Sequence, residues 1–177
     1  VFHKAYGFHE YSDTIRVKLT DVYDLASVTK ISTGLPSLMK LYDEGKLDLQ
    51  KTIGDYLPWV RGTDKASLKL WDVLLHQAGL KAWIPFYRET IDTLNNGTVN
   101  YNIYARNSDS IHTVRVAENV YMRHDWVDTM YKRIMQSELG PAGKYIYSDN
   151  DYIFLGKIIE QISGITLDQY VRKTFYD

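Results

Sequence analysis

The sequence predicts a mostly helical α+β fold in which a β-hairpin precedes a series of helices. Residues 2–20 alternate apolar and polar positions around a turn signal at Ser12-Asp13-Thr14, a pattern typical of two short antiparallel strands. Residues 27–44 and 152–162 instead repeat apolar residues at intervals of three and four, which is the spacing of one helix face. A chain of 177 residues with 45% hydrophobic content can bury a core, so we expect one domain, with the hairpin over 1–22 and the helical region over 23–177.

Composition narrows the range of partners. The chain has 21 Lys and Arg residues against 22 Asp and Glu residues, which gives no overall attraction to nucleic acid or to an anionic membrane. No apolar run approaches the roughly 20 residues of a membrane-spanning helix. The absence of cysteine excludes disulfides, thiolate catalysis and Cys-ligated zinc. We therefore expect no nucleic-acid partner and no membrane span.

The first predicted helix, over residues 27–44, opens with a serine and a lysine one turn apart. Ser27 would lie at the positive end of the helix dipole, and Lys30 would share its face of the helix. A lysine within reach of a serine hydroxyl can take its proton if the amine is partly neutral, so the pair indicates acyl transfer through a serine ester. The structural alternative is that Ser27 is only a helix N-cap.

The remainder of this helix contains a second S-x-x-K match, Ser37 to Lys40, which lies in the helix interior and has no free backbone donors near it. Pro36 removes one helical hydrogen bond and predicts a kink near residues 32–34. Gly45 can end the helix in a left-handed cap. The predicted buried face consists of Val28, Ile31, Leu35, Leu38 and Tyr42.

Several blocks, in a fixed order, resemble the serine β-lactamase and penicillin-binding-protein superfamily, most closely its class C β-lactamase, D-alanyl-D-alanine carboxypeptidase and esterase branch. The blocks are Tyr23-Asp24-Leu25-Ala26-Ser27-Val28-Thr29-Lys30, residues 38–47, Ile53-Gly54-Asp55-Tyr56-Leu57-Pro58, Val73-Leu74-Leu75-His76-Gln77-Ala78-Gly79-Leu80, and Tyr147-Ser148-Asp149 with the helix up to Gly164. The resemblance implies the helical subdomain of a β-lactamase/transpeptidase-like fold, with the hairpin as a remnant of its antiparallel sheet.

The resemblance also implies roles for four residues. Ser27 would be the nucleophile, Lys30 its base, Tyr147 a proton relay, and Asp149 an orienting or substrate-contacting group. Asp149 stands where asparagine is common in the superfamily, and a carboxylate there would hold Lys30 charged and weaken it as a base. The resemblance implies a small-molecule or peptidoglycan-derived substrate and no metal or organic cofactor. The structural alternative for Tyr147 is packing beneath the next helix, and Ser148 is an alternative hydroxyl without a nucleophilic role in the superfamily.

Two further features allow more than one interpretation. His76, at the end of a predicted helix over 68–76, could be a general base, but we favour a structural role because a histidine is stabilised at a helix C-terminus. Residues 81–140 are rich in aromatic residues, with a helix predicted over 125–137. These aromatics could shape a pocket for sugar or acyl chains, although we favour their filling a core. A final helix is predicted over 167–175.

The superfamily's third motif, Lys-Thr-Gly or His-Thr-Gly, does not follow the second in this sequence. The resemblance therefore predicts a truncated domain with an incomplete site, because that strand would supply an oxyanion donor. The expected function is that of a serine hydrolase acting through an acyl-enzyme, of β-lactamase, D-Ala-D-Ala carboxypeptidase or esterase type. The alternatives are a non-catalytic module that binds peptidoglycan fragments or a protein partner, and a structural module that self-associates through an exposed sheet edge. The superfamily usually works in the periplasm or outside the cell.

Overall fold

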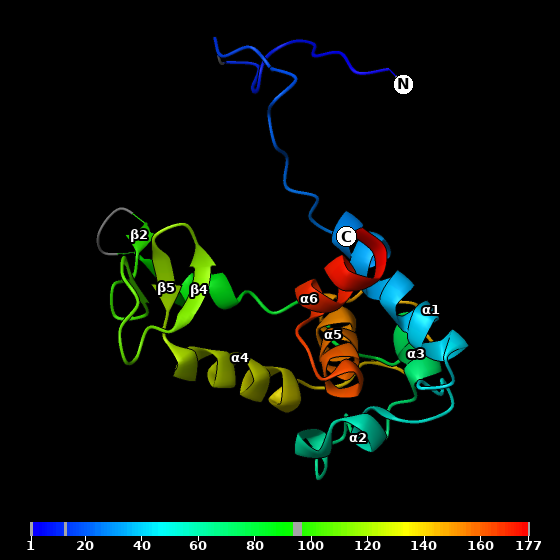
Figure 1. The fold of residues 1–177 in the computed structure, drawn as a ribbon. Helices are drawn as coiled ribbons and strands as arrows, with labels where there is room; N and C mark the ends of the chain where they lie inside the picture. The colour runs from blue at the N-terminus through cyan, green and yellow to red at the C-terminus, as the bar shows by residue number, and fades with distance from the viewer. Residues whose placement is uncertain (1, 13, 94–96, 177) are drawn as a thin grey trace.

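The computed structural model describes residues 2–12, 14–93 and 97–176. The helices α1, α2, α3, α5 and α6 form a compact body, and α4 extends from it as an arm that carries two small sheets (Figure 1). The N-terminal segment runs away from this body (Figure 1). None of the described helices is long and apolar enough to cross a bilayer.

The N-terminal segment is largely extended. One antiparallel bridge joins Phe8 to Arg16, and the His9 backbone N–H donates to the Ile15 carbonyl at 3.2 Å. The antiparallel return expected of a hairpin is therefore present, but the ladder is a single bridge rather than two regular strands. A two-stranded hairpin is only marginally stable unless an apolar face packs on another layer, and Phe2, 80% exposed, finds no such layer here. Asp13, in the predicted turn, lies outside the described residues.

The first helix combines a π-helical turn, η1 (Lys30–Gly34), with the α-helix α1 (Leu35–Asp43). Helical conformation begins at Val28. Because Pro36 has no N–H to offer to the carbonyl four residues earlier, the regular α ladder is interrupted there, and the wider π turn directly precedes it. A π-helical turn thus lies where a kink was predicted, near residues 32–34. The helix ends at Asp43, and Gly45 just beyond its C-cap is left-handed with φ +67°, as expected.

The buried face of this helix differs from the predicted one. Leu38 is buried as expected, together with Gly34, Ser37 and Leu41. Val28, Ile31 and Tyr42 are instead 49%, 63% and 57% exposed. The π turn adds residues to the first turn and so rotates the segment before it relative to α1. A side chain at Gly34 would approach the Tyr152 ring to 3.1 Å, so this glycine allows the close contact with α5.

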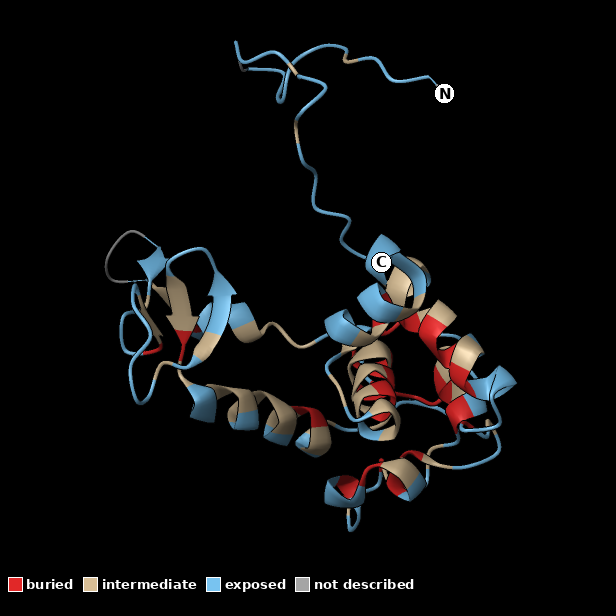
Figure 2. Ribbon diagram, in the orientation of Figure 1, coloured by how far each residue is buried: buried red, intermediate tan, exposed pale blue. Residues whose placement is uncertain are grey.

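Helix α5 (Asp149–Ser163) is the centre of the body and contacts η1, α1, α2 and α6. Its Phe154, Leu155, Ile158 and Ile159 are fully buried. Figure 2 shows these buried positions along α5 and α1. The helix begins three residues earlier than the predicted 152, because Ser148 caps it, and it ends as expected at Gly164, which has φ +73°. The apolar stripe therefore identified the helix correctly but not its start.

The helices between the first helix and the arm are short. Thr52 and Asp55 form a capping box at the start of α2. The predicted helix over 68–76 is reduced to α3 and a turn, and His76 has a left-handed backbone with φ +57°. The elements are α2 (Ile53–Tyr56), η2 (Pro58–Val60), α3 (Leu70–Leu74) and η3 (Phe86–Glu89).

The arm contains strands that the sequence did not predict. They form an antiparallel pair, β1-β2, and a three-stranded antiparallel sheet in the order β3-β5-β4. The elements are β1 (Ile91–Asp92), β2 (Thr98–Val99), β3 (Tyr104–Ala105), β4 (Val114–Ala117), β5 (Val120–Met122) and α4 (His124–Gln136). The position of α4 agrees with the helix predicted over 125–137.

The expectation that the aromatic side chains of residues 81–140 fill a core holds for only some of them. Phe86 and Tyr131 are partly buried and pack against the hydrophobic core. Tyr104 and Tyr121 are partly buried as well, whereas Trp83, Tyr87 and Tyr101 are exposed. At the C-terminal end, α6 (Leu167–Val171) and η4 (Arg172–Tyr176) match the helix predicted over 167–175.

Candidate active site

Ser27 lies in the turn that leads into the first helix, with its side chain exposed. The preceding residue, Ala26, has a left-handed backbone with φ +44°, which is uncommon for a residue with a Cβ. The Asp24 carboxylate accepts the Ala26 backbone N–H at 2.7 Å and so helps to hold this turn. The local chain thus presents the Ser27 hydroxyl at the solvent-facing start of a helix.

Lys30 joins Ser27 to a residue far along the chain. Its Nζ atom lies 3.1 Å from Ser27 Oγ and 2.7 Å from Asp149 Oδ1. The same atom is 5.1 Å from the centre of the Tyr147 ring, within cation–π range. The four residues singled out from the sequence are therefore brought together, from the first helix and from the start of α5.

Charges at this cluster are set by its hydrogen bonds. Burial alone would lower the pKa of the Lys30 ammonium, but hydrogen bonds to Asp149 and Tyr147 raise it above the ordinary lysine value. Hydrogen bonds with Ser27 and then with Lys30 lower the pKa of the Tyr147 phenol. Lys30 is therefore held as an ammonium, which agrees with the effect predicted for a carboxylate at position 149.

The segment that carries Tyr147 is fixed to the segment that follows α3. The Ile146 N–H donates to the His76 carbonyl, and the Asp149 N–H donates to the Ala82 carbonyl, each at 2.8 Å. The Ser148 hydroxyl donates to the Lys81 carbonyl at 2.8 Å and accepts the N–H of the second residue of α5 at 3.1 Å. Ser148 is fully buried, and its hydroxyl is committed to these structural bonds.

His76 lies beside the cluster. Its ring centre is 4.7 Å from that of Tyr147, and its Nδ1 atom is 2.5 Å from Asp151 Oδ2. The partner that sequence reasoning did not find is thus Asp151. The only signal was its place in Ser148-Asp149-Asn150-Asp151, where an S-x-x-D pattern would ordinarily indicate a capping box.

The second S-x-x-K match has no such surroundings. Ser37 is fully buried and donates its hydroxyl to the Thr33 carbonyl at 2.7 Å. Lys40 forms an ion pair with Glu44 at 3.1 Å. Among the described residues no group of three His, Cys, Asp or Glu side chains could hold a metal ion.

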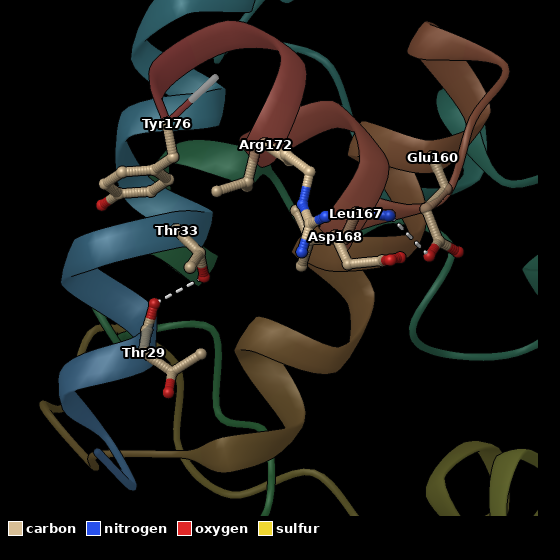
Figure 3. A pocket seen from close by; sticks show the side chains of 8 residues that line it. Thr29, Thr33, Glu160, Leu167, Asp168, Arg172 and Tyr176 are labelled. Atoms are coloured by element: carbon tan, nitrogen blue, oxygen red, sulfur yellow. Dashed lines mark hydrogen bonds between the residues drawn. The ribbon is translucent and has the colours of Figure 1, made fainter. Parts of the chain in front are cut away.

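A pocket of about 720 Å³ lies on another side of the first helix (Figure 3). None of Ser27, Lys30, Tyr147 and Asp149 lines it. Its lining residues are Thr29, Thr33, Glu160, Leu167, Asp168, Val171, Arg172 and Tyr176. The Thr33 hydroxyl there donates to the Thr29 carbonyl at 2.6 Å (Figure 3). This polar group of the lining is therefore already hydrogen-bonded within the helix. The polar cluster around Ser27, rather than this pocket, is the candidate site.

Known proteins resemble this chain in sequence and in fold. A protein described as a D-alanyl-D-alanine carboxypeptidase, from Salmonella paratyphi A, is 31% identical over 191 residues, covering 99% of this chain and 38% of that protein. The chain thus spans 38% of the length of this relative.

Solved structures share the fold. FmtA from Staphylococcus aureus is similar with a TM-score of 0.64 and 23% identity, covering 98% of this chain and 38% of that one. A class C β-lactamase from Rhodobacter sphaeroides has a TM-score of 0.55 and 21% identity, covering 97% and 38%. The β-lactamase family model matches residues 1–177. The chain therefore belongs to the β-lactamase family, within the superfamily of serine β-lactamases and penicillin-binding proteins.

Proposed function

We propose that this chain carries the acylation centre of a serine hydrolase, with Ser27 as the nucleophile. The observation that supports this most directly is the contact of Lys30 Nζ with both Ser27 Oγ and Asp149 Oδ1, beside the ring of Tyr147. The substrates we propose are acyl compounds of the D-Ala-D-Ala peptide, β-lactam or ester type. The name of the Salmonella relative supports the first of these.

The pKa directions favour Tyr147 over Lys30 as the group that takes the serine proton. The Lys30 ammonium stabilises the Tyr147 phenolate, which removes the proton from Ser27 Oγ as this oxygen attacks the acyl carbonyl. The carbon–leaving-group bond then breaks, and the phenol returns the proton to the departing amine or alcohol. An ester on Ser27 remains, and water hydrolyses it by the same proton transfers in reverse order.

We propose that this chain acylates slowly by itself. The superfamily's third motif would place further hydrogen-bond donors at the acyl oxygen, and losing one such donor costs roughly 100- to 1000-fold in rate in a comparable hydrolase. The longer relatives have room for that strand, since this chain covers 38% of the Salmonella protein. Work in the periplasm or outside the cell follows from the same family membership and is part of the proposal.

Covalent labelling tests the nucleophile. The chain is incubated with a fluorescent fluorophosphonate or a fluorescent penicillin, and the labelled peptide is identified by mass spectrometry. We expect the label on Ser27, and its loss in Ser27→Ala, while Ser37→Ala, the matched change in the second S-x-x-K match, keeps it. Label on another serine, or equal labelling of Ser27→Ala, would contradict the proposal. Saturable binding of peptidoglycan fragments that survives Ser27→Ala, without ester hydrolysis, would instead indicate the non-catalytic module.

A further inference from the structure

Asp151 is a buried acid whose contacts do not suit a carboxylate. It lies in the first turn of α5, only 1% exposed. Its Oδ2 atom is 2.5 Å from His76 Nδ1, and its Oδ1 atom has no hydrogen-bond partner within the part of the chain that the structure describes. An ionised carboxylate with an unsatisfied buried oxygen would be strongly unfavourable.

A second donor indicates where the proton lies. The Ser148 backbone N–H points at the same His76 Nδ1 atom, at a distance of 3.2 Å. A backbone N–H can only donate, so this contact is favourable when Nδ1 presents its lone pair, which the Ser148 N–H and a proton on Asp151 would share. Asp151 then supplies the proton of the 2.5 Å contact, and the histidine proton lies on Nε2. The hydrogen-bond pattern therefore favours a carboxylic acid at Asp151 and a neutral His76.

The electrostatic surroundings agree with this assignment. Burial raises the pKa of Asp151 to about 8. Burial, followed by the charge of Lys30, lowers the pKa of His76, against a smaller opposing effect of Asp149. The other titratable groups that face the pair are phenols, with ring centres 4.7 Å (Tyr147), 5.9 Å (Tyr152) and 6.0 Å (Tyr145) from that of His76.

This pair touches the segment that holds the proposed proton carrier. The His76 ring lies against Tyr147, its carbonyl accepts the Ile146 N–H, and its Nδ1 accepts the Ser148 N–H. When Asp151 releases its proton to solvent, the carboxylate favours the other tautomer of the neutral imidazole, which gives up its proton at Nε2 and takes one at Nδ1. That Nδ1–H would be set against the Ser148 N–H and would displace the residue next to Tyr147.

We propose that Asp151, kept as a neutral carboxylic acid, and His76 are positioning residues that fix the Tyr147 segment against Lys30. The proton state of the pair is independent of the proposed function, whereas its effect on catalysis rests on the proposed role of Tyr147. The two parts therefore need separate measurements.

The proton state is tested first. ¹⁵N NMR of the folded chain should show His76 neutral with its proton on Nε2 at neutral pH. Between about pH 5 and pH 7 the unfolded Asp151 is ionised and the folded one is protonated, so folding should take up about one more proton in the wild type than in Asp151→Asn. Calorimetry in buffers of different ionisation enthalpy measures that difference. A proton on Nδ1, or equal uptake by the two proteins, would overturn the assignment.

The positioning role is tested by the rate of Ser27 labelling. Asp151→Asn keeps a neutral donor to Nδ1, so we expect a rate within about threefold of the wild type, whereas Asp151→Leu, which has no donor, should lose roughly 10- to 100-fold, as for a misplaced catalytic group. The wild-type rate should fall as the pH rises through about 8, and Asp151→Asn should lack this fall. A rate unchanged in Asp151→Leu, or the same alkaline fall in Asp151→Asn, would refute positioning.

The two tests separate the possible failures. If Asp151→Leu does not fold, the alkaline fall in Asp151→Asn still decides the positioning role. If the wild type does not label at Ser27, the proposed function and with it the catalytic part of the inference fail, while NMR and proton uptake still decide the state of Asp151.

Discussion

At the scale of single residues, Asp149 controls the acid–base state of the site. It raises the pKa of Lys30 by its hydrogen bond, and its charge opposes the lowering of the pKa of Tyr147. Asp149→Asn therefore lowers both pKa values. The group that takes the serine proton, amine or phenolate, acts in its unprotonated form. A lower pKa makes more of that form present at a given pH. We expect the acid side of the labelling-rate profile to move to lower pH.

The rates at which the wild type and Asp149→Asn are labelled, measured from pH 5 to pH 9, check this prediction. The control is Asp128→Asn, the same change at an exposed position on α4. An acid limb that stays in place in Asp149→Asn, or moves to higher pH, would mean that Asp149 does not act on the base.

The chemistry of single residues predicted one part of this site and did not predict a second part. The S-x-x-K spacing placed Ser27 and Lys30 together, since one helical turn separates them wherever the helix lies. The effect of a carboxylate at position 149 followed from its charge. The His76–Asp151 pair could not be predicted, because 75 residues separate its members and local sequence does not encode such contacts.

At the scale of elements, Ser148 determines where α5 begins. Its buried hydroxyl accepts backbone N–H groups of the first turn and donates to the Lys81 carbonyl. Ser148→Ala should lower the free energy of unfolding by about 0.5–2 kcal/mol, since a cap is lost while the Lys81 carbonyl keeps the Asn150 side-chain amide as a donor at 2.7 Å. Urea unfolding followed by circular dichroism measures this change. Ser163→Ala, at the opposite end of α5, removes a more exposed hydroxyl and should cost less; an equal cost in both variants would refute the capping role.

The helices were more predictable than the strands. The apolar stripe of α5 runs over fifteen residues, long enough for the period of a helix to show. Strands β1, β2 and β3 have two residues each, too few for any alternation to be visible. Val28 and Ile31 were placed on the wrong face because the predicted stripe kept regular helical spacing on both sides of the expected kink, whereas the π turn shifts the phase there.

At the scale of the whole molecule, a buried lysine joins the body to the arm. Lys65 is 1% exposed, donates to the Ser137 carbonyl at the end of α4, and pairs with Asp64 at 2.8 Å. Lysine is rarely buried to this degree, so sequence alone would have placed it at the surface. The contact spans 72 residues and links the end of α4 to the body.

The two members of this ion pair should respond unequally to substitution. Asp64→Asn leaves a buried ammonium without its anion, whereas Lys65→Met leaves a carboxylate that is 53% exposed and therefore solvated. Removing one partner of a buried charge is costly, while an apolar replacement of similar volume is often tolerated. Allowing for the exposure of Asp64, we expect Asp64→Asn to cost roughly 2–3 kcal/mol and Lys65→Met about 1 kcal/mol or less.

In the double variant no buried charge remains, so its free energy of unfolding, measured in urea, should match that of Lys65→Met. A larger loss in Lys65→Met than in Asp64→Asn would show that the bond to the Ser137 carbonyl, rather than the paired charge, stabilises the junction between body and arm.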